Sequence, residues 1–348
     1  MKLKDLGKSL ERGGKSLLRG SLLKLLPKPH APKGPIDPAK VKRVLAVRHD
    51  ARLGNLLLLT PSLRLLKSAF PNAKIEVLLA DRYGDALKFN SCVDEILTAK
   101  SLPGLPLRGY DLAFDFSPQH AFSLSSAVWT ALSAAKRRIG FDRGDAAKFL
   151  DDLAPVPTTQ AHETANLASL VRHAMPGLAA GTPKTEYHLG PGEKEEGAKT
   201  WKSWGLDENG VALFLGARAE KRLDPEWFFE LGKRIVSGGR KVVLTGGPAE
   251  RKLLEGKTIP AGIVLAPELE LRRFAATIVN ARAVLTADTG PMHLAIALGV
   301  PTVQLFSHTE PWRFGYAQAG SLILETPGRH PSVDEAEAAL SVVLARKG

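Results

Sequence analysis

Cysteine is almost absent from this chain of 348 residues, since Cys92 is the only one. A single cysteine excludes an intrachain disulfide and a zinc site built on cysteines, and it is typical of a reducing compartment. Long apolar runs are missing too, because no stretch approaches the roughly 18 uninterrupted apolar residues of a membrane span. No Gly-x-Gly-x-x-Gly follows the first expected strand, which disfavours a dinucleotide-dependent dehydrogenase.

Positive charge is abundant, but it is concentrated at one end. The net charge is +12, and residues 1–43 hold twelve basic and three acidic side chains, so +9 belongs to that segment. The remaining 305 residues are close to neutral, which argues against a nucleic-acid partner for the folded body.

The basic segment has a helical pattern. Basic side chains between Lys4 and Arg19 recur at steps of three and four, opposite a row of leucines. This pattern predicts an amphipathic helix attracted to an anionic membrane surface through residues 2–26. An unstructured, solvated arm is the open alternative. The proline-rich residues 27–35 predict a stiff linker after it.

Beyond the linker, short apolar strands alternate with helical segments, which is typical of parallel, doubly wound sheets. The pattern runs to about residue 187 and then restarts. We therefore predict an α/β protein with two Rossmann-like domains facing a cleft, over residues 41–187 and 188–348, preceded by the basic segment and linker in residues 1–40. Expected strands lie in residues 44–47, 74–80, 94–99, 110–116, 137–141, 210–217, 240–247, 262–267, 281–288 and 302–306.

One stretch, ADTGPMHLAIALG in residues 287–299, has the character of a ligand-binding turn. Asp288 ends an expected strand, Gly290 lets the backbone approach a ligand closely, and Pro291 suits the first position of a helix. A helix start of this kind binds phosphate through its N–H groups and dipole, and His293 adds a donor. Aspartic proteases also contain the tripeptide Asp-Thr-Gly. They need an all-β fold and a second such motif, so the protease interpretation fails here. Simple helix capping by Asp288 stays open.

Extended to DTGPMHLAIALGVPTVQLF, this stretch resembles the signature of glycosyltransferase family 9, the lipopolysaccharide heptosyltransferases and their relatives. The loop that follows reads FSHTEP, with Ser307 where the family usually has glycine. The resemblance extends over residues 41–316. Its other segments are VLAVRHDARLGNLLLLTPSLRLLKSAFPNAKIEVLL, RRIGF, LGARAEKRLDPEWFFEL and LTGGPAER.

The resemblance implies a GT-B fold and an inverting, metal-independent glycosyl transfer from a nucleotide diphosphate sugar. The best-known donor of the family is ADP-heptose, and the acceptor is a lipid-linked saccharide, the lipopolysaccharide core or a related surface glycan. Residues 41–187 would hold the acceptor and residues 188–348 the donor. No cofactor, metal site or nucleic-acid partner is expected. The resemblance implies a cytoplasmic protein that acts peripherally at the inner face of the cytoplasmic membrane.

The resemblance also assigns donor-side residues. Lys221 occupies the position of a lysine that would meet the charge building on the departing diphosphate. Glu250 matches a turn glutamate expected on the ribose hydroxyls. A solvated surface role for Lys221 and a first-turn helix charge for Glu250 stay open. The predicted donor-binding set is Arg218, Glu250, Asp288, Thr289, Gly290, Pro291, Met292 and His293.

The general base is where the sequence departs from the family. Many members end the first loop in Gly-Asp, whose aspartate is the presumed base, whereas here Gly54 precedes Asn55. An amide cannot accept a proton at neutral pH, so Asp50, five residues upstream, is the candidate base. His49 and His120 are weaker candidates. The predicted catalytic set is Asp50, Asn55 and Lys221.

The departure at Asn55 leaves a second function open, that of a catalytically impaired member that binds nucleotide sugars or acts as a scaffold. Two aromatic side chains outside the predicted sets are expected to have structural roles. Trp312 is expected to pack into the core rather than stack on a base. His162 is likewise expected to be structural.

Overall fold

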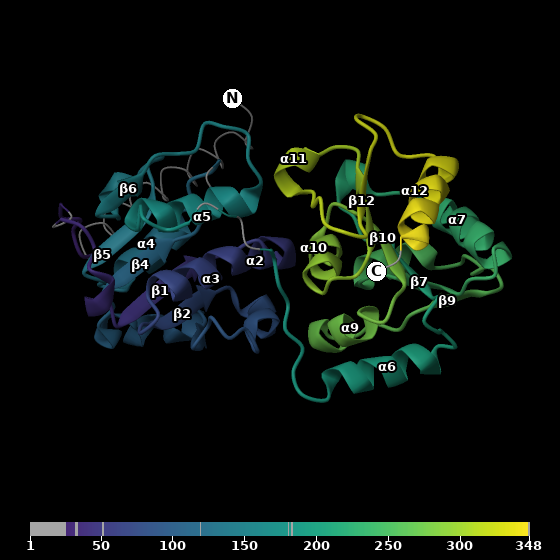
Figure 1. Cartoon of the computed structure of the whole chain (residues 1–348), viewed down its shortest axis with the longest axis horizontal. Coiled ribbons are helices and arrows are strands. Elements are labelled where there is room, and N and C mark those ends of the chain that lie inside the picture. Colours follow the sequence, from purple (N-terminus) through teal and green to yellow (C-terminus); the bar gives the residue numbers. More distant parts are fainter. Residues whose placement is uncertain are drawn as a thin grey trace, which may run out of the picture.

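A computed structural model describes residues 26–346, apart from residues 32–33, 51, 119, 180 and 182–183. It contains two parallel six-stranded sheets, one in each half of the molecule (Figure 1). The basic segment lies outside the described residues except for Leu26, so the amphipathic helix stays a prediction. None of the described helices is long and apolar enough to cross a membrane.

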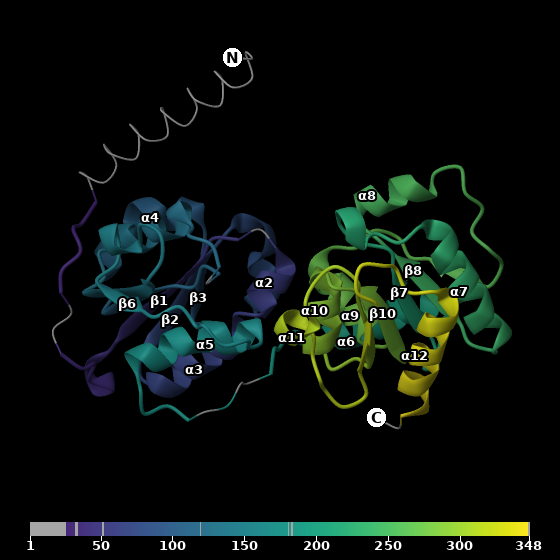
Figure 2. The ribbon, with the colours of Figure 1, turned by 90° about the horizontal axis from the view of Figure 1, so that it is seen from above.

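The first half contains strands β1 to β6, in the sheet order β3-β2-β1-β4-β5-β6. The strands are β1 (Arg43–Arg48), β2 (Lys74–Leu79), β3 (Glu95–Leu97), β4 (Leu112–Asp115), β5 (Arg137–Phe141) and β6 (Asp152–Ala154). The helices are α2 (Leu53–Leu57), α3 (Thr60–Ala69), α4 (Leu124–Leu132) and α5 (Glu163–Ala174). Helices α3 and α5 cover one face of the sheet and α4 covers the other (Figure 2). The central strands are therefore buried on both faces, which explains their nearly continuous apolar runs.

The second half contains β7 to β12, in the order β12-β11-β10-β7-β8-β9. The strands are β7 (Val211–Phe214), β8 (Val242–Thr245), β9 (Ile263–Leu265), β10 (Ala283–Ala287), β11 (Thr302–Phe306) and β12 (Leu322–Glu325). The helices are α6 (Glu193–Ser203), α7 (Pro225–Ser237), α8 (Pro248–Arg251), α9 (Leu271–Ile278), α10 (Gly290–Ala297), α11 (Pro311–Phe314) and α12 (Val333–Ala345). The predicted α/β fold with two doubly wound sheets is confirmed.

The side chains of β7 show how the second sheet is sandwiched. Val211 and Leu213 lie in a core cluster with side chains of α7 and α12. Ala212 and Phe214 lie in another cluster with side chains of α6, α9 and α10. Alternate residues therefore face opposite helical layers, as the two-residue period of a strand requires.

Two strands of the structure, β6 and β12, were not predicted. Helix α6 packs on α9 so closely that a Cβ on Gly197 would lie 1.8 Å from the carbonyl oxygen of Ala276. It is a fixed part of the second half.

The start of the expected linker is packed against the first half. Leu26 is buried among side chains that include Ala127 and Phe149. The buried guanidinium of Arg138 donates to the carbonyl oxygens of Pro27 at 2.8 Å and Lys28 at 2.9 Å. Pro27 and Lys28 are therefore fixed on the first half, where their carbonyls, together with Asp151, satisfy the buried charge of Arg138.

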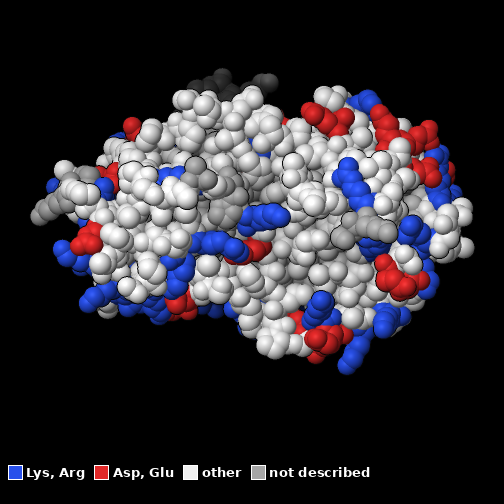
Figure 3. All heavy atoms as spheres, viewed as in Figure 1, with Lys and Arg blue, Asp and Glu red and all other residues white. Residues whose placement is uncertain are grey.

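Charge on the described surface is mixed. The face in Figure 3 carries basic and acidic side chains on both halves. This fits the near-neutral balance of the sequence after residue 43.

Candidate active site between the two sheets

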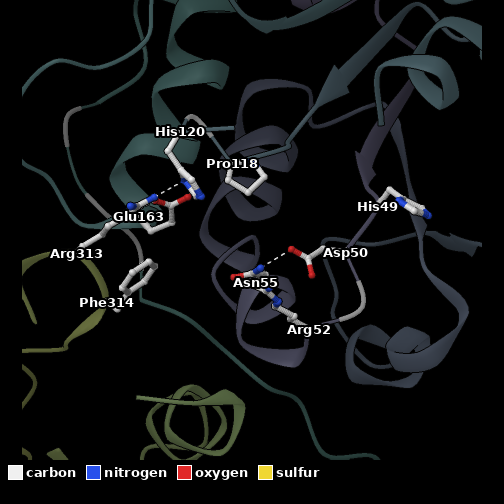
Figure 4. A pocket seen from close by; sticks show the side chains of 9 residues that line it. All are labelled: His49, Asp50, Arg52, Asn55, Pro118, His120, Glu163, Arg313 and Phe314. Atoms are coloured by element: carbon white, nitrogen blue, oxygen red, sulfur yellow. Dashed lines mark hydrogen bonds and ion pairs between the residues drawn. The ribbon is translucent and has the colours of Figure 1, made fainter. Parts of the chain in front are cut away.

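A polar cavity lies where the carboxyl end of the first sheet meets the second half. It has a volume of about 480 Å³. Its lining, shown in Figure 4, consists of His49, Asp50, Arg52, Asn55, Pro118, His120, Glu163, Arg313 and Phe314. The last two belong to α11 of the second half and the others to the first half. Ligands of doubly wound sheets bind at such carboxyl ends, beside the point where the strand order reverses.

Asp50 and Asn55 lie side by side in this cavity. Asp50 follows β1, and Asn55 lies within α2, from which its Nδ2 donates a hydrogen bond to Oδ2 of Asp50 (Figure 4). Arg48 Nη2 lies 3.9 Å from the same carboxylate oxygen, and burial lowers the pKa of Arg48. The side chain of Asp50 is therefore held in one orientation, next to the buried cation of Arg48.

The two histidines near Asp50 are engaged elsewhere. The ring of His49 packs edge-on against Trp129, with 4.2 Å between centroids, and it points away from Asp50 in Figure 4. His120 Nδ1 lies 2.5 Å from Nη2 of Arg313 and accepts its hydrogen. Burial and then the charge of Arg313 lower the pKa of His120. Asp50 is accordingly the best-placed proton acceptor of the three.

In the second half, Lys221 and Asp288 form an ion pair. Lys221 Nζ lies 2.7 Å from Oδ2 of Asp288, and Thr309 donates its hydroxyl to the same oxygen at 2.8 Å. The side chain of Lys221 is mostly buried, so it is not a free surface lysine. Asp288 does not cap α10 either, because the cap residue is Thr289, which makes no side-chain capping bond. The structure therefore shows neither a solvated surface role for Lys221 nor helix capping by Asp288.

The start of α10 offers fewer backbone donors than the sequence suggests. The amides of Met292 and His293 donate to the carbonyl oxygen of Thr289 at 3.1 and 3.4 Å, and Pro291 has no N–H. The side chain of Met292 is fully buried. The polar side chains of Lys221 and His293 lie at this turn beside Asp288.

Gly290 has a role that its sequence motif did not reveal. A Cβ on Gly290 would lie 3.2 Å from Cβ of Leu53, and one on Gly54 would lie 2.5 Å from Cδ2 of His293. Helices α2 and α10, which carry Asn55 and His293, are therefore in direct contact between the two halves.

The remaining predicted donor residues lie at the ends of β7 and β8. Glu250 Oε2 accepts a hydrogen bond from the amide of Gly247 at 3.0 Å, at the start of α8. Its Oε1 would lie 3.8 Å from a Cβ on Gly216, just after β7. One carboxylate oxygen thus serves the helix start, as the alternative interpretation expected. Arg218 is exposed.

The ion pair between Glu163 and Arg313 was not predicted. Arg313 Nη2 lies 3.0 Å from Oε2 of Glu163, so a cation of α11 meets a carboxylate at the start of α5 in the other half. No local pattern could reveal a pair separated by 150 residues.

The neighbouring Trp312 is 43% exposed, so its expected place in the core is wrong. His162 caps α5, which is the structural role expected for it.

Comparison with known proteins gives a consistent result. A family profile described as glycosyltransferase family 9 (heptosyltransferase) matches residues 106–337. The lipopolysaccharide heptosyltransferase 1 of Pseudomonas aeruginosa is 38% identical over 91 residues, a match that spans only 25% of each chain. The lipopolysaccharide heptosyltransferase 3 of Escherichia coli is 25% identical over 74% of this chain and 83% of its own. The solved ADP-heptose lps heptosyltransferase II of E. coli superposes with a TM-score of 0.72 at 20% identity, over 87% of this chain and 98% of that one.

Proposed function

Because this chain belongs to glycosyltransferase family 9 (heptosyltransferase), we propose that it transfers heptose from ADP-heptose to a lipopolysaccharide core or a related surface glycan. The observation that carries this proposal is the contact between α2 and α10. It brings Asn55, which holds the carboxylate of Asp50, close to the helix start that carries His293. A base and a diphosphate site on opposite sides of one cleft are what glycosyl transfer requires.

The acceptor hydroxyl loses its proton to Asp50. Its oxygen attacks the anomeric carbon from the face opposite to the diphosphate, so that a new C–O bond forms while the bond to the diphosphate oxygen breaks and that oxygen keeps the electron pair. Attack from the opposite face inverts the anomeric configuration. Asn55 keeps the carboxylate of Asp50 oriented through its hydrogen bond. This orientation should raise the rate of proton transfer more than it raises the affinity for the substrate.

Positive charge must stabilise the departing diphosphate. We propose that residues of the chain supply this charge, rather than a metal ion. Lys221 Nζ, already next to Asp288, supplies the cation. The positive end of the α10 dipole adds to it. Glu250, near the end of β7, is the residue proposed for the ribose hydroxyls, using the oxygen that does not serve the amide of Gly247.

We also propose that the enzyme works peripherally at the inner face of the cytoplasmic membrane, held near its lipid-linked acceptor by the basic residues 2–26. The contacts of Arg138 with Pro27 and Lys28 support this, because they hold the chain that follows this segment against the first half. A deletion should therefore stop at residue 25, since a longer one would remove the carbonyls of Pro27 and Lys28 and leave Asp151 to satisfy the buried Arg138. Deleting residues 1–25 should reduce binding to vesicles of anionic lipid and preserve transfer to a soluble acceptor. Unchanged vesicle binding would contradict this part of the proposal.

The donor is tested by a thermal-shift screen with ADP, UDP, GDP and CDP, followed by a transfer assay with ADP-heptose and a truncated lipopolysaccharide acceptor. We expect stabilisation by ADP above the other diphosphates and turnover that continues after addition of EDTA. Stabilisation by another nucleotide would overturn the donor, and loss of turnover with EDTA would overturn metal independence. The second candidate, an impaired binding protein, is favoured by Asn55 alone; ADP binding without any transfer would support it.

A further inference from the structure

His293 is held in an unusual environment for a ligand-binding histidine. It is 4% exposed, and its ring lies against the backbone of Gly54 in the other half. Its Nδ1 lies 2.7 Å from the hydroxyl oxygen of Tyr316, and its Nε2 lies 3.7 Å from Oδ1 of Asp288. Each ring nitrogen thus has one polar neighbour, and the two neighbours differ in chemistry.

The protonation state follows from these neighbours. Burial lowers the pKa of His293 to about 4, so the ring is neutral at pH 7 and has one N–H. Asp288 Oδ2 already accepts from Lys221 and Thr309, which leaves Oδ1 facing Nε2 of His293. A lone pair on Nε2 would repel that carboxylate, whereas an N–H is attracted to it. The proton therefore belongs on Nε2, and Nδ1 must accept.

Tyr316 is suited to be the donor to Nδ1. Burial of its hydroxyl end raises its pKa, so it keeps its proton. Its backbone is clamped by the buried Gln304 of β11, whose Nε2 donates to the carbonyl of Tyr316 at 2.9 Å and whose Oε1 accepts from its amide at 2.9 Å. The ring of His162 packs against the Tyr316 ring at 4.8 Å between centroids. The hydroxyl is therefore held in place from both the backbone and the ring.

We propose that Tyr316 is a positioning residue, which donates to Nδ1 of His293 and keeps the ring proton on Nε2, on the side of Asp288 at the start of α10. This role rests on the proposed function, because that function assigns a diphosphate to the start of α10. The ring of His293 also occupies the space that a side chain at position 54 would need. The group acting on the diphosphate is then a neutral N–H, in addition to the charged Lys221.

The test uses the full chain with ¹⁵N-labelled histidine, in which two-bond ¹H–¹⁵N spectra distinguish the two tautomers. The His293 signals are assigned by their loss in His293→Gln. We expect the Nε2–H tautomer in the wild type, and a mixture of tautomers in Tyr316→Phe. The dissociation constant of ADP should rise roughly 3- to 10-fold in this variant, as expected for a weakened hydrogen bond to a charged group. Tyr187→Phe is the matched control, because its buried hydroxyl lies 3.4 Å from Arg272 rather than near His293.

Two results would overturn the proposal. One is a wild-type His293 with its proton on Nδ1, and this spectrum decides even if Tyr316→Phe does not fold by circular dichroism. The other is a folded Tyr316→Phe with unchanged tautomer and ADP affinity. If the wild type has the Nε2–H tautomer but does not bind ADP, the proposed donor is wrong while the assigned link between Tyr316 and His293 is supported.

Discussion

Asn55 donates a hydrogen bond from its side-chain amide to the carboxylate of Asp50. The residue that stands at the family's usual aspartate position is therefore a partner of the carboxylate we assign as the base. We propose that Asp50, five residues upstream, supplies the carboxylate that the first loop lacks at position 55. This arrangement favours an active enzyme over an impaired one.

Asn55→Ala should lower kcat about tenfold and leave the affinity for ADP unchanged, because it frees Asp50 to rotate without removing the base. Asn55→Asp should shift the acid limb of the pH–rate profile to higher pH, since two adjacent carboxylates raise the pKa of the pair. Steady-state transfer rates across pH measure both. Asn209→Ala, at an exposed position of the second half, is the control. An Asn55→Ala enzyme with wild-type kcat would show that the hydrogen bond is dispensable.

Lys221→Met should lower kcat by about 10²- to 10³-fold, the usual cost of removing a charge that stabilises a leaving group. The acceptor KM should not change. The matched control is Lys233→Met, whose side chain is 57% exposed and lies 4.0 Å from Glu230. Equal activities of the two variants would remove Lys221 from the mechanism.

Gly54→Ala tests the contact between α2 and α10. Its Cβ would lie 2.5 Å from the ring of His293, so the helices must separate or the ring must move. We expect a loss of stability of about 1–3 kcal/mol in urea unfolding, together with weaker ADP binding. Gly104→Ala is the control, because no atom lies within 4 Å of its added Cβ. If both variants match the wild type, the contact is not required.

The ion pair between Glu163 and Arg313 should couple the halves energetically. Its side chains are only 3% and 17% exposed. A double-mutant cycle with Glu163→Gln and Arg313→Gln, measured by urea unfolding, should give a coupling energy of about 1–3 kcal/mol. The pair between Arg329 and Glu335, 57% and 36% exposed, should give a smaller coupling energy because water screens it. Equal coupling for both pairs would contradict this assignment.

Stability should depend on pH through His293. Burial lowers its pKa to about 4, from an ordinary 6.5, so between these values the folded state binds fewer protons than the unfolded chain. The free energy of unfolding should therefore fall as the pH is lowered from 6.5 to about 4, by on the order of 3 kcal/mol from this residue. Urea unfolding at pH 7 and 4.5 should show a smaller loss in His293→Gln than in the wild type. The exposed control His330→Gln should keep the wild-type loss; the same loss in both variants would refute the assignment.

The sequence revealed those features that depend on neighbours along the chain. The strand end, glycine and proline from Asp288 to Pro291 were predicted as a turn into a helix, and the helix starts at Gly290. The buried strands were predicted because both sheet faces are covered, which leaves runs of apolar residues. The predicted glycosyltransferase family is confirmed by the match over residues 106–337.

Other features depend on residues far apart in the chain and left no local signal. The contact of Gly54 with His293 is one, because a glycine in a sequence does not show what fills the space beside it. The packing of Pro27 and Lys28 on Arg138 is another, since a proline-rich composition indicates a linker whether or not its carbonyls are used. The predicted domain boundaries and the roles of the site residues stay predictions.

The most direct test of the account is sugar transfer from ADP-heptose by the wild type and by Asp50→Asn, with ADP affinity measured on both proteins. The account predicts turnover by the wild type, a loss of about 10²- to 10⁴-fold in the variant, and equal ADP affinity, because the variant removes only the proton acceptor. Asp142→Asn, at an exposed position beyond β5, should behave as the wild type. Wild-type turnover by Asp50→Asn would contradict the central claim that Asp50 is the general base.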